Sequence, residues 1–236
     1  MGSIWKKEIQ SYFYTPAAYV FMGVFLVMGS IFFSVGNLAA RSSNLNMLLG
    51  NLGYLWMLLS PVLTMRLMAG ERQQKTDALL FSSPCSLTGI VMGKFFAAVT
   101  VLLCTVVCTF VFAVIIAFWG KLYAAEAAVG YLGLVLCGCS FLALDLFVSC
   151  FARSQMTAVV LGFGANLMCW FSDIVANAST LPVLKNVLNF FSLYQRFEPF
   201  TQGLLRFSNV LFNVVFCGIM LFLSVRVLDA RRWSEA

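Results

Sequence analysis

Histidine is absent from this sequence of 236 residues. The absence excludes Ser-His-Asp hydrolysis, HExxH zinc chemistry and histidine ligation of haem, because each of these needs an imidazole. It also leaves the eight cysteines without the usual partners of a metal site. The pair Gly93-Lys94 lacks the glycine spacing and the Ser or Thr of a phosphate-binding loop, so we predict no nucleotide site. We therefore expect a non-catalytic chain that itself binds no cofactor and no metal.

The sequence also contains few charged residues. Only 10% of the residues are charged, whereas 61% are hydrophobic and the mean hydropathy is +0.93. A water-soluble domain of this size cannot cover its surface with so few polar groups, so we predict an all-α, polytopic membrane protein. A run of about 20 apolar residues crosses a bilayer. Such runs predict six transmembrane helices, near residues 17–38, 46–67, 94–118, 127–151, 155–177 and 208–228.

The basic residues predict the orientation of these spans. With the amino terminus in the cytoplasm, ten basic residues fall on the inner side and five on the outer side. This distribution favours a multi-pass protein of the bacterial cytoplasmic membrane with both termini in the cytoplasm. No basic patch with interleaved exposed aromatics is present in the sequence, so we expect no nucleic-acid partner. No linker divides the chain, and we predict a single transmembrane domain over residues 1–236.

The first polar segment, residues 3–15, is amphipathic. At helical spacing its apolar and aromatic residues share one face, whereas Lys6 and Lys7 fall on the other. This pattern is typical of a helix that lies in the membrane interface, with rings such as Trp5 at headgroup depth. We predict such an in-plane helix, which also contains Glu8. The alternative is a plain amino-terminal flank.

The longest polar interruption lies between Arg66 and Lys94 and reads RLMAGERQQKTDALLFSSPCSLTGIVMGK. A reversal of the chain needs only a handful of residues, so a segment this long indicates a surface that another protein contacts. We predict an exposed, amphipathic coupling segment over residues 69–84 that ends at Pro84. We expect Lys94 at the headgroups, where the next span begins.

Residues 178–207 form the third unusual segment. They are too apolar for a solvated loop, yet two prolines and several charged residues prevent them from spanning the membrane. We predict two short helices, near 183–191 and 199–206, that lie on or dip into the outer leaflet and cap a pathway. An interfacial loop without a gating role is the alternative.

Two acidic residues fall within predicted spans. Charges inside a membrane commonly mark ion pathways, which makes Asp145 and Asp173 candidates for a proton or cation relay. Neither has a clear basic partner in the sequence, and both lie close enough to a membrane surface to be hydrated. The alternative is therefore a polar residue near the interface, or one that lines a water-filled cavity. Close helix approach is expected at small residues, namely Gly29, Gly36, Gly162, Gly164 and Gly218.

Six segments in order resemble the ABC-2 type transporter permeases, and most closely the subgroup that includes gliding-motility-associated permeases. They are WKKEIQSYFYTPAAYV, SPVLTMRLMAGER, TDALLFSSPCSLTGIVMGKFFA, CFARSQMTAVVLGF, FSLYQRFEPFTQGLLRFSNVLF and VRVLDARRW. The likeness covers nearly the whole chain. It implies the ABC-2, type V exporter-like architecture, in which a six-span permease half pairs with a second half and with ATP-binding-cassette subunits that hold ATP and Mg²⁺.

In this family the in-plane helix and the loop between spans two and three contact the ATPase. The resemblance therefore assigns ATPase coupling to Glu71, Arg72, Thr76, Leu79, Leu80 and Pro84. We add Phe81, because a coupling helix must be exposed and amphipathic, and Leu79, Leu80 and Phe81 before the proline turn supply its apolar side. The sequence departs from the family at Lys75, where Gly is common, and at Ala78, where an acidic residue is common. The resemblance also implies contact with membrane lipid and allows an auxiliary extracytoplasmic protein.

The leading hypothesis is thus the transmembrane subunit of an ATP-driven transporter, most readily an exporter. An ion-coupled secondary transporter or channel is the first alternative. A non-transporting ABC-type complex that drives motility or envelope remodelling is the second.

Overall fold

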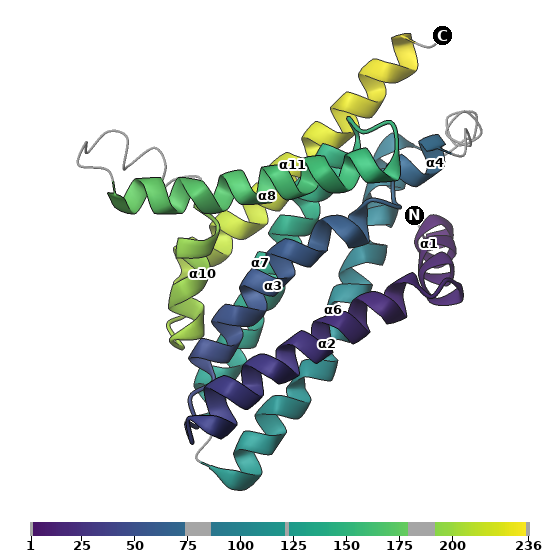
Figure 1. Cartoon of the computed structure of the whole chain (residues 1–236). Helices are drawn as coiled ribbons and strands as arrows, with labels where there is room; N and C mark the ends of the chain where they lie inside the picture. The colour runs from purple at the N-terminus through teal and green to yellow at the C-terminus, as the bar shows by residue number, and fades with distance from the viewer. Residues whose placement is uncertain (1, 74–85, 121–122, 179–191, 235–236) are drawn as a thin grey trace.

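The computed structural model describes residues 2–73, 86–120, 123–178 and 192–234, and these residues form helices joined by short connections, without a strand among them (Figure 1). The predicted all-α class is therefore confirmed. The elements are α1 (Gly2–Tyr14), α2 (Ala17–Phe33), the π-helical η1 (Ser34–Ala39), α3 (Asn46–Thr64), α4 (Ala69–Gln73), α6 (Leu87–Trp119), α7 (Ala124–Ser149), α8 (Gln155–Ala178), α10 (Tyr194–Thr201) and α11 (Phe207–Ser234).

Among the residues that the structure describes, five helical segments are long and apolar enough to cross a membrane. They are Ala17–Ala39, Asn46–Thr64, Leu87–Phe118, Ala124–Ser149 and Phe207–Ala230. The predicted span at residues 155–177 corresponds to α8, which is not among these five, and in Figure 1 α8 runs across the bundle rather than along it. A six-span topology therefore stays a prediction.

The start of α6 differs from its predicted position at residue 94. Ser86 has an extended backbone, and its hydroxyl accepts a hydrogen bond from the backbone N–H of Gly89 at 3.2 Å. This side-chain cap begins the helix at Leu87, because it satisfies one of the N–H groups that the first turn leaves unpaired. Lys94 consequently lies about two turns inside α6 instead of at its beginning.

The core is centred on α7, which packs against α3, α6, α8, α10 and α11. Trp56 of α3 is buried between α7 and α2. Its ring packs edge-on against the rings of Phe21 and Phe25, with centroids 5.4 and 5.6 Å apart. By contrast, α2 and α11 leave most of their apolar surface uncovered in the single chain. These uncovered faces are available to lipid or to another chain.

Close helix approach is confirmed at two of the five predicted glycines. A Cβ atom on Gly29 or Gly162 would lie 3.2 or 2.8 Å from a side chain of α3. Gly36 makes only an ordinary contact at 3.9 Å, and Gly164 and Gly218 have no described atom within 4 Å of that position. Within the single chain, the last three glycines are therefore not needed for packing.

Candidate functional site

The bundle has two ends, which we name by their short helices. The α1 end holds α1, the end of α3, α4, the start of α6 and the turn between α7 and α8; the α10 end holds α10 and the start of α3 (Figure 1). At one end the hydroxyl of Tyr12 in α1 donates a hydrogen bond to the carbonyl oxygen of Leu63 in α3. At the other end the hydroxyl of Tyr194 in α10 lies beside Gly50 of α3. Candidate sites lie at both ends and between them.

At the α1 end, Lys94 of α6 joins this helix to α1 and to the turn after α3. Its side chain is fully buried, with Nζ 3.1 Å from a carboxylate oxygen of Glu8 in α1, and it also donates to the carbonyl oxygen of Leu67, just beyond α3. A buried ammonium is stable only when it is paired and hydrogen-bonded, and both conditions hold here. The predicted helix start at Lys94 is therefore wrong, because α6 begins at Leu87 and places this side chain against α1; its depth at the headgroups stays a prediction.

Two further bonds fasten α1. The hydroxyl of Tyr12 donates to the carbonyl oxygen of Leu63 at 2.8 Å, and the indole N–H of Trp5 donates to Thr100 Oγ1 at 3.3 Å. The last carbonyls of a helix lack partners within it, so Tyr12 supplies one at the end of α3. Burial, reinforced by the charge of Glu8, raises the pKa of the Tyr12 phenol. We call Glu8, Tyr12 and Lys94, with their partners, the α1 junction.

The predicted in-plane segment is thus a helix in which Lys6 and Lys7 are exposed, but Trp5 of the predicted apolar face is 43% exposed too, so the amphipathic character stays a prediction. Glu8 is the exception, because it points to Lys94 rather than to solvent. The position of α1 in a membrane interface stays a prediction.

A second set of bonds, the α4 junction, ties α4 to the turn between α7 and α8. Arg72 Nη1 donates to the carbonyl oxygens of Ala152 at 2.9 Å and Cys150 at 3.4 Å, and the backbone N–H of Gln155 donates to the side chain of Gln73 at 3.2 Å. The guanidinium therefore bonds to the turn that follows α7, beside the C-terminal end of that helix, which is a favourable place for a cation.

The remaining coupling residues are only partly visible. Glu71 belongs to α4, and its side chain is outside the described part of the structure. The other predicted coupling positions also lie outside the described residues, as do the two departures from the family pattern; they are Thr76, Leu79, Leu80, Phe81 and Pro84, with Lys75 and Ala78. The structure does bring the two flanks of this segment, Gln73 and Ser86, to the α1 end.

In the middle of the bundle, Asp145 of α7 meets α3 and α8. One of its oxygens, Oδ2, lies 2.5 Å from Ser60 Oγ and 3.4 Å from Asn166 Nδ2, and the side chain is 2% exposed. Pro61 has no N–H, so the carbonyl of Met57 lacks its helical partner, and Asn166 Nδ2 donates to that carbonyl at 2.9 Å instead. The expectation that Asp145 is hydrated is wrong, because α8 covers it. The side chain of Asp173 is outside the described part.

At the α10 end, a short helix enters between α3 and α7. Phe197 and Phe200 are fully buried, and a Cβ atom on Gly53 or Gly133 would lie 2.6 or 2.3 Å from them. A short helix does form in this segment, but α10 covers residues 194–201 rather than 199–206, and its place on or in the outer leaflet stays a prediction. The other predicted short helix, 183–191, lies outside the described residues.

Two cavities lie near α10. The larger, of about 550 Å³, is lined by stacked rings of Tyr54 and Tyr194 (centroids 4.0 Å apart), by Trp170 and by polar side chains that include Asn51 and Glu198. We call it the α10 cavity. Sequence reasoning missed it, although the isolated Asn51 within an apolar span was a usable signal.

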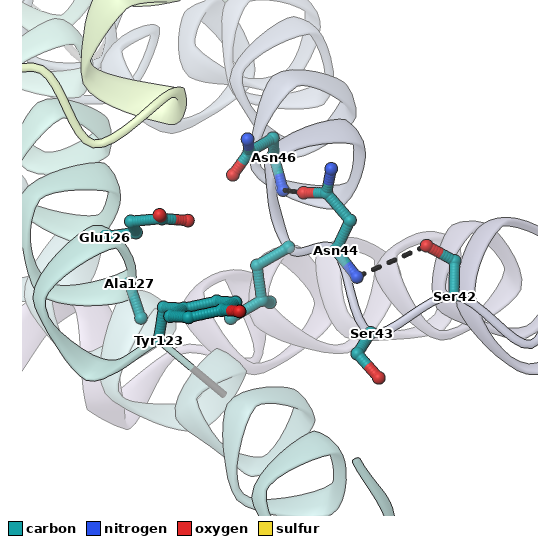
Figure 2. Close-up of a pocket in the computed structure, with 8 residues that line it drawn as sticks. Ser42, Ser43, Asn44, Asn46, Tyr123, Glu126 and Ala127 are labelled. Carbon is teal, nitrogen blue, oxygen red and sulfur yellow. Dashed lines mark hydrogen bonds between the residues drawn. The ribbon is translucent and has the colours of Figure 1, made fainter. Parts of the chain in front are cut away.

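The smaller cavity, of about 300 Å³, lies beside the loop before α3 (Figure 2). Its polar groups largely bond within the loop: Asn44 Oδ1 accepts from the N–H of Asn46 at 2.8 Å, and Ser42 Oγ accepts from the N–H of Asn44 at 3.3 Å. Figure 2 shows Glu126 and Tyr123 on the opposite wall. This arrangement is that of a helix-capping loop.

The comparisons with known proteins agree with this architecture. A family model described as ABC-2 family transporter protein matches residues 55–228, which is most of the chain. Among curated proteins no match is found. The matched region runs from α3 into α11 and includes Lys94, Arg72 and Asp145. With its apolar helices, the chain is a membrane component of an ABC transporter, and it belongs to the ABC-2 family of transporter proteins.

Proposed function

We propose that this chain is the membrane subunit of an exporter driven by a separate ATP-binding-cassette protein, which binds ATP and Mg²⁺. The observation that carries the proposal is the pair of junctions at the α1 end. Both α1 and α4 lie outside the apolar spans, yet buried or half-buried polar contacts bond α1 to α3 and α6 and bond α4 to the turn between α7 and α8. A helix that merely rested on the membrane would not need such contacts.

The junctions supply a mechanical route. A displacement of α1 acts on α3 through Tyr12 and on α6 through Lys94, because these bonds fix both helices to it. A displacement of α4 acts on the turn between α7 and α8 through Arg72. Force applied by a partner at this end would therefore reach four of the long helices. Residues 74–85, which connect α4 to α6, complete the proposed docking face.

The wider assembly follows from the family. We propose two such permease halves, identical or different, each with six spans that include α8, in a bacterial cytoplasmic membrane with both termini in the cytoplasm. The uncovered apolar faces of α2 and α11 support contact with lipid or a second half. The gliding-motility-associated subgroup, with an auxiliary extracytoplasmic protein, is the assignment that the sequence segments favour within the family.

Co-purification tests the docking face. The variant L79E/L80E/F81E places three charges at the coupling positions, and we expect it to lose an ATP-binding-cassette protein that accompanies the unaltered chain from its native membrane. The control is L204E/L205E, a pair of exposed leucines beyond α10, which should keep that protein. Retention of the ATPase by the first variant would show that the docking face is elsewhere.

Transport itself needs a second measurement. ATP-dependent flux in vesicles with the partner present separates an exporter from a complex that drives motility or envelope remodelling. Flux that follows an ion gradient without ATP would instead favour the ion-coupled alternative.

A further inference from the structure

A carboxyl group lies inside the apolar part of α7. Asp145 is 2% exposed and falls within the span Ala124–Ser149. An ionised carboxylate at such a place needs a paired cation or several strong donors, because burial removes its hydration. The contacts of Asp145 decide whether it has them.

The carboxyl group has too few partners for an ion. Its Oδ1 accepts no hydrogen bond from any described residue, and it faces Gly162 of α8, where a Cβ atom would lie 3.2 Å away. Its Oδ2 has Ser60 nearby and one long contact to Asn166. Within the described ranges the only ion pair is that of Lys94 with Glu8, so no cation compensates Asp145 there.

The surrounding helices supply no such cation either. The described groups that contact the carboxyl are Ser60 of α3 and Asn166 of α8, and Gly162 of α8 lies beside it; none of them titrates. Among the described side chains, the titratable or charged ones on α7 and its neighbours form no hydrogen bond or ion pair with Asp145; they are Tyr54, Lys94, Cys104, Cys108, Glu126, Tyr131, Cys137, Cys139, Cys169, Tyr194, Arg196, Glu198, Cys217, Arg226 and Asp229.

A proton on Asp145 removes the buried negative charge and allows each hydrogen-bond donor around it to find an acceptor. The protonated Oδ2 can donate to Ser60 Oγ at 2.5 Å, and the Ser60 hydroxyl can then donate to the carbonyl oxygen of Met57, which lies 3.5 Å away and which Pro61 leaves without its helical partner. Asn166 donates to the same carbonyl from α8. Every hydrogen in this series of hydrogen bonds has an acceptor, and no charge remains in the apolar layer.

We propose that Asp145 is a proton-binding site, and that its bound proton holds α8 against α3 and α7. Loss of the proton leaves a buried carboxylate without a counter-charge. Its free-energy cost falls when α8 moves away and water hydrates the carboxylate. Because α8 also carries Trp170 and Ile174 on the wall of the α10 cavity, proton release and the shape of that cavity change together. This inference does not depend on the identity of the partner ATPase.

Infrared spectroscopy reads the proton directly. The sequence has four aspartates, and the variant D77N/D173N/D229N leaves Asp145 as the only one. With ¹³C-labelled aspartate in this variant, purified into lipid nanodiscs at neutral pH, we expect the isotope to shift a protonated carboxyl band. An isotope shift confined to ionised carboxylate bands would overturn the proposal. If the triple variant does not fold, the labelled wild-type chain minus labelled D145N gives the same comparison.

Thermal unfolding tests whether the proton on Asp145 holds α8 against α3 and α7. Since the folded state holds the proton and the unfolded state releases it, the unfolding midpoint should fall by roughly 5 °C or more between about pH 6 and about pH 9. D145N, which keeps the shape without the charge, should lose most of this dependence, whereas D229N should keep it. An equal pH dependence in D145N contradicts the proposal. So does a midpoint that rises with sodium chloride but not with choline chloride, because that result assigns the site to a metal cation.

Discussion

Lys94 shows how a single residue can change its role when a helix begins earlier than expected. At the headgroups it would be one more solvated cation. Two turns inside α6, its ammonium group is enclosed by Glu8 and the carbonyl of Leu67, and it becomes the link between α1 and the spans. The cost of burying its charge is offset only while both partners are present.

Removal of this cation gives the first prediction. Lys94→Met leaves the carboxylate of Glu8 and the carbonyl of Leu67 without their partner, so we expect the folded state to lose about 3 kcal/mol. Unfolding in detergent measures the loss, and faster trypsin cleavage at Lys6 and Lys7 reports release of α1.

Two comparison variants sharpen that test. Lys7→Met removes an exposed charge and should change stability by less than about 0.5 kcal/mol. The double variant K94M/E8M should recover part of the loss, because it removes both charges together. Equal stability of Lys94→Met and the wild-type chain would show that the ion pair does not hold α1.

Sequence reasoning at this scale was right about residue types and wrong about surroundings. It selected Asp145 as an intramembrane acid but expected it to be hydrated, because the coverage by α8 depends on Gly162 and Asn166, far along the chain. It selected Arg72 through a family resemblance, whereas its bonds to the turn after α7 depend on how α4 folds back. Local sequence patterns do not predict such contacts between residues of different helices.

At the scale of elements, α10 is defined by what it fits into. Its two buried rings, Phe197 and Phe200, occupy space that exists only because α3 and α7 carry Gly53 and Gly133 at the contact. The apolar character of residues 178–207 predicted two short helices that lie on or dip into the outer leaflet, the second of them near 199–206. Its register was mispredicted by several residues, since complementarity with two distant glycines sets it.

The second prediction concerns this fit. Gly53→Ala places a methyl group 2.6 Å from the ring of Phe197, so we expect α10 to be displaced and stability to fall by about 2 kcal/mol. Adding Phe197→Ala should make the Gly53→Ala change much less costly, because the ring that it meets is gone. The measurement is a double-mutant cycle of unfolding free energies.

The control for this cycle is Gly164→Ala in α8, where the added methyl group meets no described atom within 4 Å. Because alanine favours a helix over glycine, this variant should be neutral or more stable by up to about 1 kcal/mol. Additive effects of Gly53→Ala and Phe197→Ala would refute the proposed fit.

For the whole molecule, hydropathy predicted the long helices well, since apolar runs without charges must lie inside a membrane or a core. Orientation rests on the count of basic residues alone, which gives the third prediction. In intact spheroplasts of a chain without its native cysteines, an impermeant maleimide should label a cysteine at residue 202, at the α10 end. It should not label one at residue 7 until the membrane is permeabilised.

Reversed labelling would place α1 and α4 outside the cell. The proposed docking of a cytoplasmic ATPase could not then hold, even though the junctions themselves would remain.

The central claim is that an ATP-binding-cassette protein docks at the α1 end, and site-specific photo-crosslinking in living cells tests it most directly. A photoreactive amino acid at residue 79 should capture that protein, whereas the same group at residue 204, beyond α10, should not. Mass spectrometry of the captured band identifies the partner. Capture at residue 204 alone, or at neither position, would contradict the account.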